Sequence, residues 1–123
     1  FKYINENPYK IDYQSKMFDC ITLILTLHHA KNILDVIKEC KRLLKDDGVL
    51  VIIEHDIWND YDNMVINLQH TLYGELYDEK IEKTGSYYNI YECDSIFSKH
   101  GFVPLFKEKL LSDYMYGQGI HLK

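Results

Sequence analysis

The distribution of apolar residues along the chain predicts alternating strands and helices. Residues 18–27 form an apolar run rich in β-branched side chains, typical of a strand covered on both faces. Three- and four-residue spacings then predict a helix over residues 32–45, capped by Asn32 and stopped by a positive φ at Gly48. Residues 49–53 form a second apolar strand. Because the connections are short, this βαβ unit predicts two adjacent parallel strands.

The second half of the chain predicts two more helices and a strand pair. Residues 61–77 have the apolar face of a helix. Residues 80–86 are polar and predict a loop, and residues 87–91 predict a short strand or an extended segment. A short helix over residues 93–100 ends at Gly101, and residues 102–111 and 114–122 form an antiparallel pair joined at Ser112-Asp113. With a short strand at residues 1–4, the pattern predicts one α/β domain over residues 1–123, its sheet mostly parallel with an antiparallel end.

Composition narrows the class of protein. The 123 residues are 46% hydrophobic and 27% charged, which excludes a disordered tail or a disulfide scaffold. The net charge is −5 and Arg42 is the single arginine, so no broad phosphate-binding surface is expected. Three cysteines without paired spacing favour a reducing, cytoplasmic compartment. No apolar run approaches the roughly 20 residues needed to span a bilayer.

Several segments, in this order, resemble a class I S-adenosylmethionine-dependent methyltransferase. They are Phe18-Asp19-Cys20-Ile21, Leu27-His28-His29, the run from Lys41 to Leu50 (KRLLKDDGVL), and Phe97 to Phe102 (FSKHGF). The resemblance covers nearly the whole chain and aligns it with strands three to seven of a Rossmann-like methyltransferase sheet. It implies S-adenosylmethionine as cofactor and methyl transfer as activity. A looser resemblance, carried by Glu54-His55-Asp56 and a helix with His70 and Tyr73, is to methyltransferases of large DNA viruses.

The resemblance implies cofactor-binding residues at the carboxyl edge of the sheet. Asn7 aligns with the family's aspartate near the adenine amino group, and its carbonyl oxygen can accept the same hydrogen bond. Leu27, His28 and His29 end the family's fourth strand, at the edge where open α/β sheets bind ligands. We expect at least one of the two histidines to line the pocket; the alternative is one solvent-facing and one packed histidine.

Glu54 and His55 are the candidate catalytic residues. They end the next strand on the same edge, where a carboxylate or imidazole can accept the proton that the methyl acceptor loses. The alternative is a polar strand end that binds loop amides. A metal site at His28-His29 is not expected, because neighbouring strand residues point to opposite faces. Tyrosines 87, 88 and 91 could stack on a base, although half-buried tyrosines of this kind are more common.

The sequence departs from the family at its beginning. The glycine-rich turn after strand one and the acidic residue after strand two are absent from these 123 residues. We therefore expect a partner segment beside the fourth strand: an N-terminal half, another subunit or a second copy. One alternative is a catalytically inactive subunit that braces an active partner, and a weaker one is an oxidoreductase fragment. The methyl acceptor could be an RNA cap, other RNA or a small molecule, with RNA disfavoured by the low arginine content.

Overall fold

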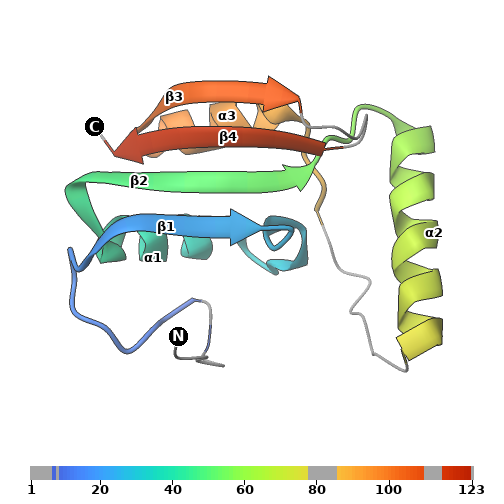
Figure 1. Ribbon diagram of the computed structural model, residues 1–123, viewed down its shortest axis with the longest axis horizontal. Coiled ribbons are helices and arrows are strands. Elements are labelled where there is room, and N and C mark those ends of the chain that lie inside the picture. Colours follow the sequence, from blue (N-terminus) through green and yellow to red (C-terminus); the bar gives the residue numbers. More distant parts are fainter. Residues whose placement is uncertain (1–6, 8, 78–85, 110–114, 123) are drawn as a thin grey trace.

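The chain folds around a four-stranded sheet with the strand order β1-β2-β4-β3 (Figure 1). The computed structural model describes residue 7 and residues 9–77, 86–109 and 115–122. Strands β1 (Phe18–Ile24) and β2 (Leu44–His55) are parallel, while β4 (Met115–Leu122) runs antiparallel to both β2 and β3 (Phe102–Lys109). This confirms the parallel βαβ unit and the antiparallel end. The strand predicted at residues 1–4 and the turn at residues 112–113 lie outside the described residues.

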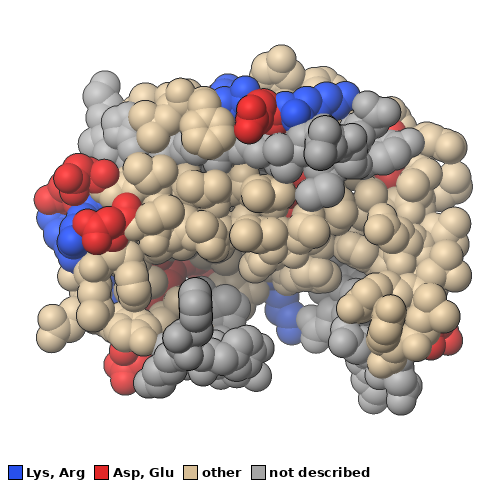
Figure 2. All heavy atoms as spheres, viewed as in Figure 1, with Lys and Arg blue, Asp and Glu red and all other residues tan. Residues whose placement is uncertain are grey.

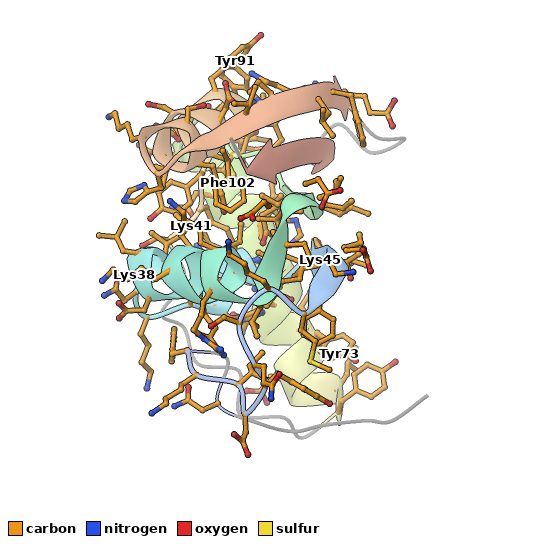
Figure 3. The ribbon with its side chains drawn as sticks, turned by 90° about the vertical axis from the view of Figure 1, so that its left-hand side faces the viewer. Lys38, Lys41, Lys45, Tyr73, Tyr91 and Phe102 are labelled. Atoms are coloured by element: carbon orange, nitrogen blue, oxygen red, sulfur yellow. The ribbon has the colours of Figure 1, made fainter. Side chains whose placement is uncertain are left out.

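Two helices cover one face of the sheet. Helices α1 (Ile33–Leu43) and α3 (Ile90–Lys99) lie side by side behind the strands in Figure 1. The core between them and the sheet contains Ile37, Leu50 and Phe97, all with no exposed surface. Lys41 lies on the side of α1 nearer Phe102 (Figure 3), and its ammonium donates to the backbone oxygen of His100 at 2.7 Å. This contact ties the end of α1 to the end of α3.

No helix of the described residues covers the opposite face of the sheet. Figure 2 shows a broad central area without charged side chains, with Lys, Arg, Asp and Glu gathered at its margins. On β1, Cys20, Thr22 and Ile24 are exposed, whereas Ile21 and Leu23 pack against the core. The expectation that this strand is covered on both faces is therefore wrong for the described residues. The apolar run still has the composition of a doubly covered strand, although only one face has a covering layer among these residues.

The connection from α1 to β2 differs from the expected glycine stop. Asn32 caps α1 as predicted, with its side-chain oxygen accepting from the backbone N–H of Leu34 at 3.0 Å. The helix ends at Leu43, and β2 begins at the next residue, so Gly48 lies inside the strand and has no positive φ. A Cβ at Gly48 would approach Leu44 Cδ2 to 2.9 Å and the Lys45 oxygen to 3.0 Å. Glycine is required here by close approach, not by a left-handed backbone.

The remaining elements shift the predicted boundaries by a few residues. The apolar run ends as a strand at Ile24, and a 3₁₀ turn, η1 (Leu27–His29), follows it. Helix α3 begins at Ile90 because Asn89 and Glu92 form a capping box, which leaves residues 86–89 without regular structure. Gly101 ends it with a φ of 88°. Residues 110–114, which include part of the predicted strand pair, lie outside the described residues.

Helix α2 (Asp60–Tyr77) matches its predicted range to within one residue. It stands across the carboxyl ends of β1 and β2 instead of lying on the sheet (Figure 1). Ile66 is its only buried residue among those described, and the predicted apolar face is largely solvent-exposed at Met64, Leu68, Leu72 and Leu76. Within the described ranges, no helix combines the length and the apolar character that crossing a membrane demands.

Candidate functional site

Three histidines from three elements meet at the carboxyl ends of β1 and β2. His28 belongs to η1, His55 ends β2, and His70 lies on the part of α2 that crosses this edge. The ring centroid of His28 lies 4.9 Å from that of His55 and 5.0 Å from that of His70. One nitrogen from each imidazole lies within 4.8 Å of the other two. We call these three residues the histidine cluster.

Glu54 fixes one side of the cluster. Its Oε2 accepts the backbone N–H of Leu27 at 2.9 Å and that of His28 at 3.3 Å. Its Oε1 lies 2.6 Å from His28 Nδ1 and accepts the backbone N–H of His55 at 2.9 Å. An ionised carboxylate only accepts hydrogen bonds, so the proton of the His28–Glu54 bond belongs on Nδ1. The lone pair of His28 is consequently on Nε2.

Two nitrogens in the cluster are buried without a partner. His28 is 1% exposed and His55 is 6% exposed, yet His28 Nε2 and His55 Nδ1 make no hydrogen bond within the described protein. A buried polar atom without a partner costs about 1–3 kcal/mol, so native folds leave few of them. Two such atoms in one cluster indicate a site shaped for something that binds them.

His70 and Tyr87 complete the site; the sequence analysis named His70 only in the looser viral resemblance and Tyr87 only as a possible base-stacking residue. The hydroxyl of Tyr87 lies 3.1 Å from His70 Nδ1, and its ring stacks on His28 with centroids 5.3 Å apart. Tyr87 comes from residues 86–89, directly before α3. Histidine spacing gave no signal here, because 15 positions separate His55 from His70 in the sequence. Only the placement of α2 across the sheet edge brings them together.

Burial and the proximity of the side chains shift the pKa values of the site residues. Burial lowers the pKa of His55 to about 4; the Glu54 charge opposes this shift, and the neighbouring imidazoles reinforce it. Burial also lowers the pKa values of His29 and His70. For Glu54, burial alone would raise the pKa, but the hydrogen bonds from His28 and from the backbone N–H of His55, with the charge that these imidazoles carry when protonated, together hold the pKa below its usual value. His55 is accordingly a neutral imidazole at physiological pH, and Glu54 is ionised.

The predicted cofactor-binding residues separate into two places. His28 points into the cluster, whereas the neighbouring His29 is exposed and lines a groove together with Leu27. Both lie on the 3₁₀ turn η1, which does not impose the alternation of a strand, and their rings stay 4.0 Å apart between centroids. Asn7 is exposed, and its side-chain oxygen accepts the backbone N–H of Tyr9 at 3.0 Å. Whether these residues bind the cofactor stays a prediction.

The groove follows the free edge of β1. Its volume is about 500 Å³, and its lining includes Cys20 and Thr22 of β1 and Val36 and Leu43 of α1. Tyr9 closes one side and His29 stands at the carboxyl end. Among the described residues, β1 pairs only with β2, so its other edge carries unpaired backbone groups. The groove is therefore bordered by a strand edge that can accept another strand.

Comparisons with known proteins identify the fold. The profile of a family described as a methyltransferase domain matches residues 1–52, which include β1, α1 and most of β2. No curated protein matches the chain in sequence. Three solved structures, from Aquifex aeolicus, Thermotoga maritima and Pyrococcus horikoshii, are similar to it. The first is called a SAM-dependent methyltransferase, the second a possible histamine N-methyltransferase, and the third bears no functional name.

The likeness extends over almost the entire chain. The Aquifex aeolicus protein is 17% identical with a TM-score of 0.69, covering 99% of this chain and 55% of its own. The Thermotoga maritima protein is 17% identical with a TM-score of 0.65, covering 96% of this chain and 62% of its own. The Pyrococcus horikoshii protein is 20% identical with a TM-score of 0.64, covering 96% of this chain and 57% of its own. The chain thus has the Rossmann-like fold of class I methyltransferases. It spans little more than half the length of these structures.

Proposed function

We propose that this chain is the C-terminal part of an S-adenosylmethionine-dependent methyltransferase domain and forms the acceptor side of its cleft. The supporting observation is the histidine cluster at the carboxyl ends of β1 and β2. In open α/β sheets, ligands bind at this edge. The fold and the family profile over residues 1–52 support methyl transfer in general. The looser likeness to viral enzymes and the cytoplasmic location remain predictions.

The described residues fit one wall of a cofactor site. S-adenosylmethionine, when bound, supplies an electrophilic methyl group. Leu27 and exposed His29 line the carboxyl end of the groove and can contact the cofactor there, as can Asn7 on the preceding segment. His28 faces the cluster, and its contact to the cofactor would run through the ring of His29, 4.0 Å away between centroids. The glycine-rich turn that holds the cofactor's methionine portion is absent from these 123 residues.

The free edge of β1 supports a partner segment. We assign the groove beside it to a strand of the domain's N-terminal half, which in this family lies next to the strand equivalent to β1. Its apolar lining suits a packed strand and helix better than a charged ligand. The spans of 55–62% in similar structures leave room for such a half. A partner subunit with the same strand would satisfy the edge equally.

The two predicted catalytic residues have unequal access to an acceptor. Both oxygens of Glu54 are occupied by hydrogen bonds from η1, His28 and His55, so we assign Glu54 the role of positioning His28. The Nδ1 atom of His55 has no partner, which leaves it able to contact the acceptor. Methyl transfer is an in-line displacement that depends mainly on such positioning. We favour a small polar acceptor over RNA, because Arg42 is committed to Glu39.

Calorimetry with S-adenosylhomocysteine tests the proposal. The titrations compare this chain with a longer protein translated from the upstream coding sequence. We expect micromolar binding by the longer protein and none by residues 1–123 alone. In the longer protein, His29→Ala should weaken binding at least tenfold with an unchanged melting temperature. His100→Gln is the matched control, because His100 lies at the opposite end of α3 from the cluster and its ring bonds the backbone oxygen of Ile96.

Each outcome separates the candidates. An upstream segment with a glycine-rich turn and micromolar binding supports the enzyme. A longer protein that folds but binds no S-adenosylhomocysteine favours the bracing subunit. Micromolar binding by the chain alone contradicts the need for a partner segment. If His29→Ala lowers the melting temperature and leaves binding unchanged, His29 is a structural residue.

A further inference from the structure

We propose that His28, His55 and His70 bind a divalent transition-metal ion through one nitrogen each. The three imidazoles come from η1, β2 and α2, and their candidate ligand atoms lie within 4.8 Å of one another. In a tetrahedral zinc site, nitrogens at about 2.0–2.1 Å from the metal are about 3.3 Å apart. Side-chain movements of roughly an ångström or less per ring would close that difference.

The hydrogen bonds select which nitrogen each histidine presents. His28 Nδ1 is held by Glu54, so its free nitrogen is the buried, unpartnered Nε2. His55 presents its buried, unpartnered Nδ1. The Nδ1 atom of His70 lies 3.1 Å from the hydroxyl of Tyr87, which leaves Nε2 for coordination. A metal ion would satisfy both buried nitrogens that otherwise have no partner.

The surroundings have the features of a metal site beyond its ligands. Histidines that bind metals donate their other ring N–H to a carboxylate, a carbonyl oxygen or water, which fixes the tautomer and raises the basicity of the ligand. The His28–Glu54 contact of 2.6 Å, buried on both sides, has this geometry. Tyr87 holds His70 in the same manner. Structural stacking of histidines alone would need neither of these orienting bonds.

The ligand set indicates the class of metal. Imidazole nitrogens suit zinc, copper, iron, cobalt and nickel, whereas magnesium and calcium require oxygen ligands. Three protein ligands leave a fourth position open, as in catalytic zinc sites. If the proposed methyl transfer is correct, that position suits the oxygen or nitrogen of the acceptor. The ion would lower the pKa of the acceptor, and His55 would then act as a ligand and not as the proton acceptor.

A Co²⁺ titration of the full, tag-free chain tests the metal site. Co²⁺ reports its geometry in visible absorption, with strong bands for tetrahedral and weak bands for octahedral coordination. We expect one equivalent of Co²⁺ to bind with strong bands and Zn²⁺ to displace it. A roughly 1,000-fold excess of Mg²⁺ should leave Co²⁺ in place, because Mg²⁺ prefers oxygen ligands. His70→Gln should weaken Co²⁺ binding at least tenfold, since it removes a ligand on a half-buried helix position.

Controls separate the metal site from nonspecific binding. His100→Gln removes a histidine outside the cluster and should leave Co²⁺ affinity unchanged. His55→Gln is the second variant if His70→Gln fails to fold by circular dichroism. The proposal is overturned if Co²⁺ gives only weak octahedral bands, or if folded cluster variants bind it as tightly as the parent chain. S-adenosylhomocysteine is absent from this titration, so the metal site can fail while the proposed methyl transfer stands, and the reverse.

Discussion

Two buried glutamates in this chain have opposite kinds of partner. Glu39 on α1 is 7% exposed and bonds Arg42, whose Nη2 lies 2.6 Å from Oε1 and whose Nε lies 2.8 Å from Oε2. Glu54 on β2 is 2% exposed and bonds the imidazole of His28. Both also accept backbone N–H groups from distant segments. The first acid faces a permanent cation, whereas the second faces a group that can be neutral.

The difference shows which region is structural. Arg42 donates as well to the backbone oxygens of Tyr13 and Ile11, so the Glu39 cluster holds the segment before β1 against α1 with its polar groups satisfied. Beside Glu54, the histidine cluster leaves His28 Nε2 and His55 Nδ1 without partners among the described residues. A fully bonded ion pair stabilises one arrangement of the chain. An incompletely bonded cluster of lone pairs has capacity for a ligand.

Replacing each glutamate by glutamine gives the largest contrast. Glu54→Gln places an amide N–H₂ among four donors, so buried N–H groups lose their acceptor, and each one lost should lower the free energy of unfolding by about 1–3 kcal/mol. Glu39→Gln keeps an oxygen for the backbone N–H of Ile11, and Arg42 stays partly exposed and bonded to backbone oxygens, so this change should cost about 1–2 kcal/mol. Urea unfolding measures both values. Equal costs would show that the two clusters do not differ as described.

Zinc should stabilise the chain through one cluster only. At a free Zn²⁺ concentration 100 times the dissociation constant, binding to the folded state adds about 2.7 kcal/mol to the free energy of unfolding. Differential scanning calorimetry should therefore show a higher melting temperature for the parent chain and for Glu39→Gln. It should show no increase for His70→Gln. An increase in all three would place the metal outside the histidine cluster.

Acid should erase the effect of the Glu39 substitution. The hydrogen bond from Arg42 holds the pKa of Glu39 below its ordinary value, against the effect of burial. A lowered folded-state pKa means that this stabilisation is complete above the unfolded pKa and is lost as the pH falls through the folded one. The gap in unfolding free energy between the parent and Glu39→Gln should narrow as the pH falls below about 5 and should vanish below the folded-state pKa of Glu39. A constant gap would mean that the charge on Glu39 does not contribute.

The sequence predicted the parts of the fold that depend on local pattern. The apolar spacing of α1, the capping by Asn32 and the parallel pairing of β1 with β2 are confirmed. The position of Glu54 and His55 at the carboxyl end of β2 follows from the length of that strand. These features depend on residues close in sequence, for which periodicity is informative.

The site itself required tertiary structure. Nothing local indicates that α2 stands across the sheet edge, because an apolar face predicts a helix but not the element it packs against, and most of that face is exposed. That placement is what brings His70 to His28. A metal site was not expected at His28-His29 because these two neighbours alone are poorly placed to bind one ion. His55 and His70, which are 26 and 41 positions beyond His29, are not suggested as further ligands by the sequence. The sequence pattern predicts a helix stop at Gly48, whereas the role of this glycine in the structure is steric and depends on the close approach of Leu44.

The smallest expected effect concerns the chemical labelling of two cysteines, one on β1 and one beside Glu39 on α1. Cys20 is exposed on β1, whereas Cys40, next to Glu39 on α1, is buried, and burial followed by the charge of Glu39 raises the pKa of its thiol to about 12. The thiolate is the reactive form, so iodoacetamide should label Cys20 in the folded chain. It should reach Cys40 only through unfolding. Mass spectrometry of the labelled peptides distinguishes these sites from Cys93, which is also buried.

The labelling rate of Cys40 then reports the same free energy of unfolding as the urea experiment. If Glu39→Gln costs about 1–2 kcal/mol, the unfolded population and the rate of Cys40 labelling should both rise about 5–30-fold. The rate for Cys20 should be unchanged, because that thiol is accessible without unfolding. Loss of the Glu39 charge also favours the Cys40 thiolate, but a thiol with a pKa of about 12 remains protonated at neutral pH. If Cys40 in the parent chain reacts as fast as Cys20, the packing of α1 against the sheet is incorrect, and with it the structural half of the comparison.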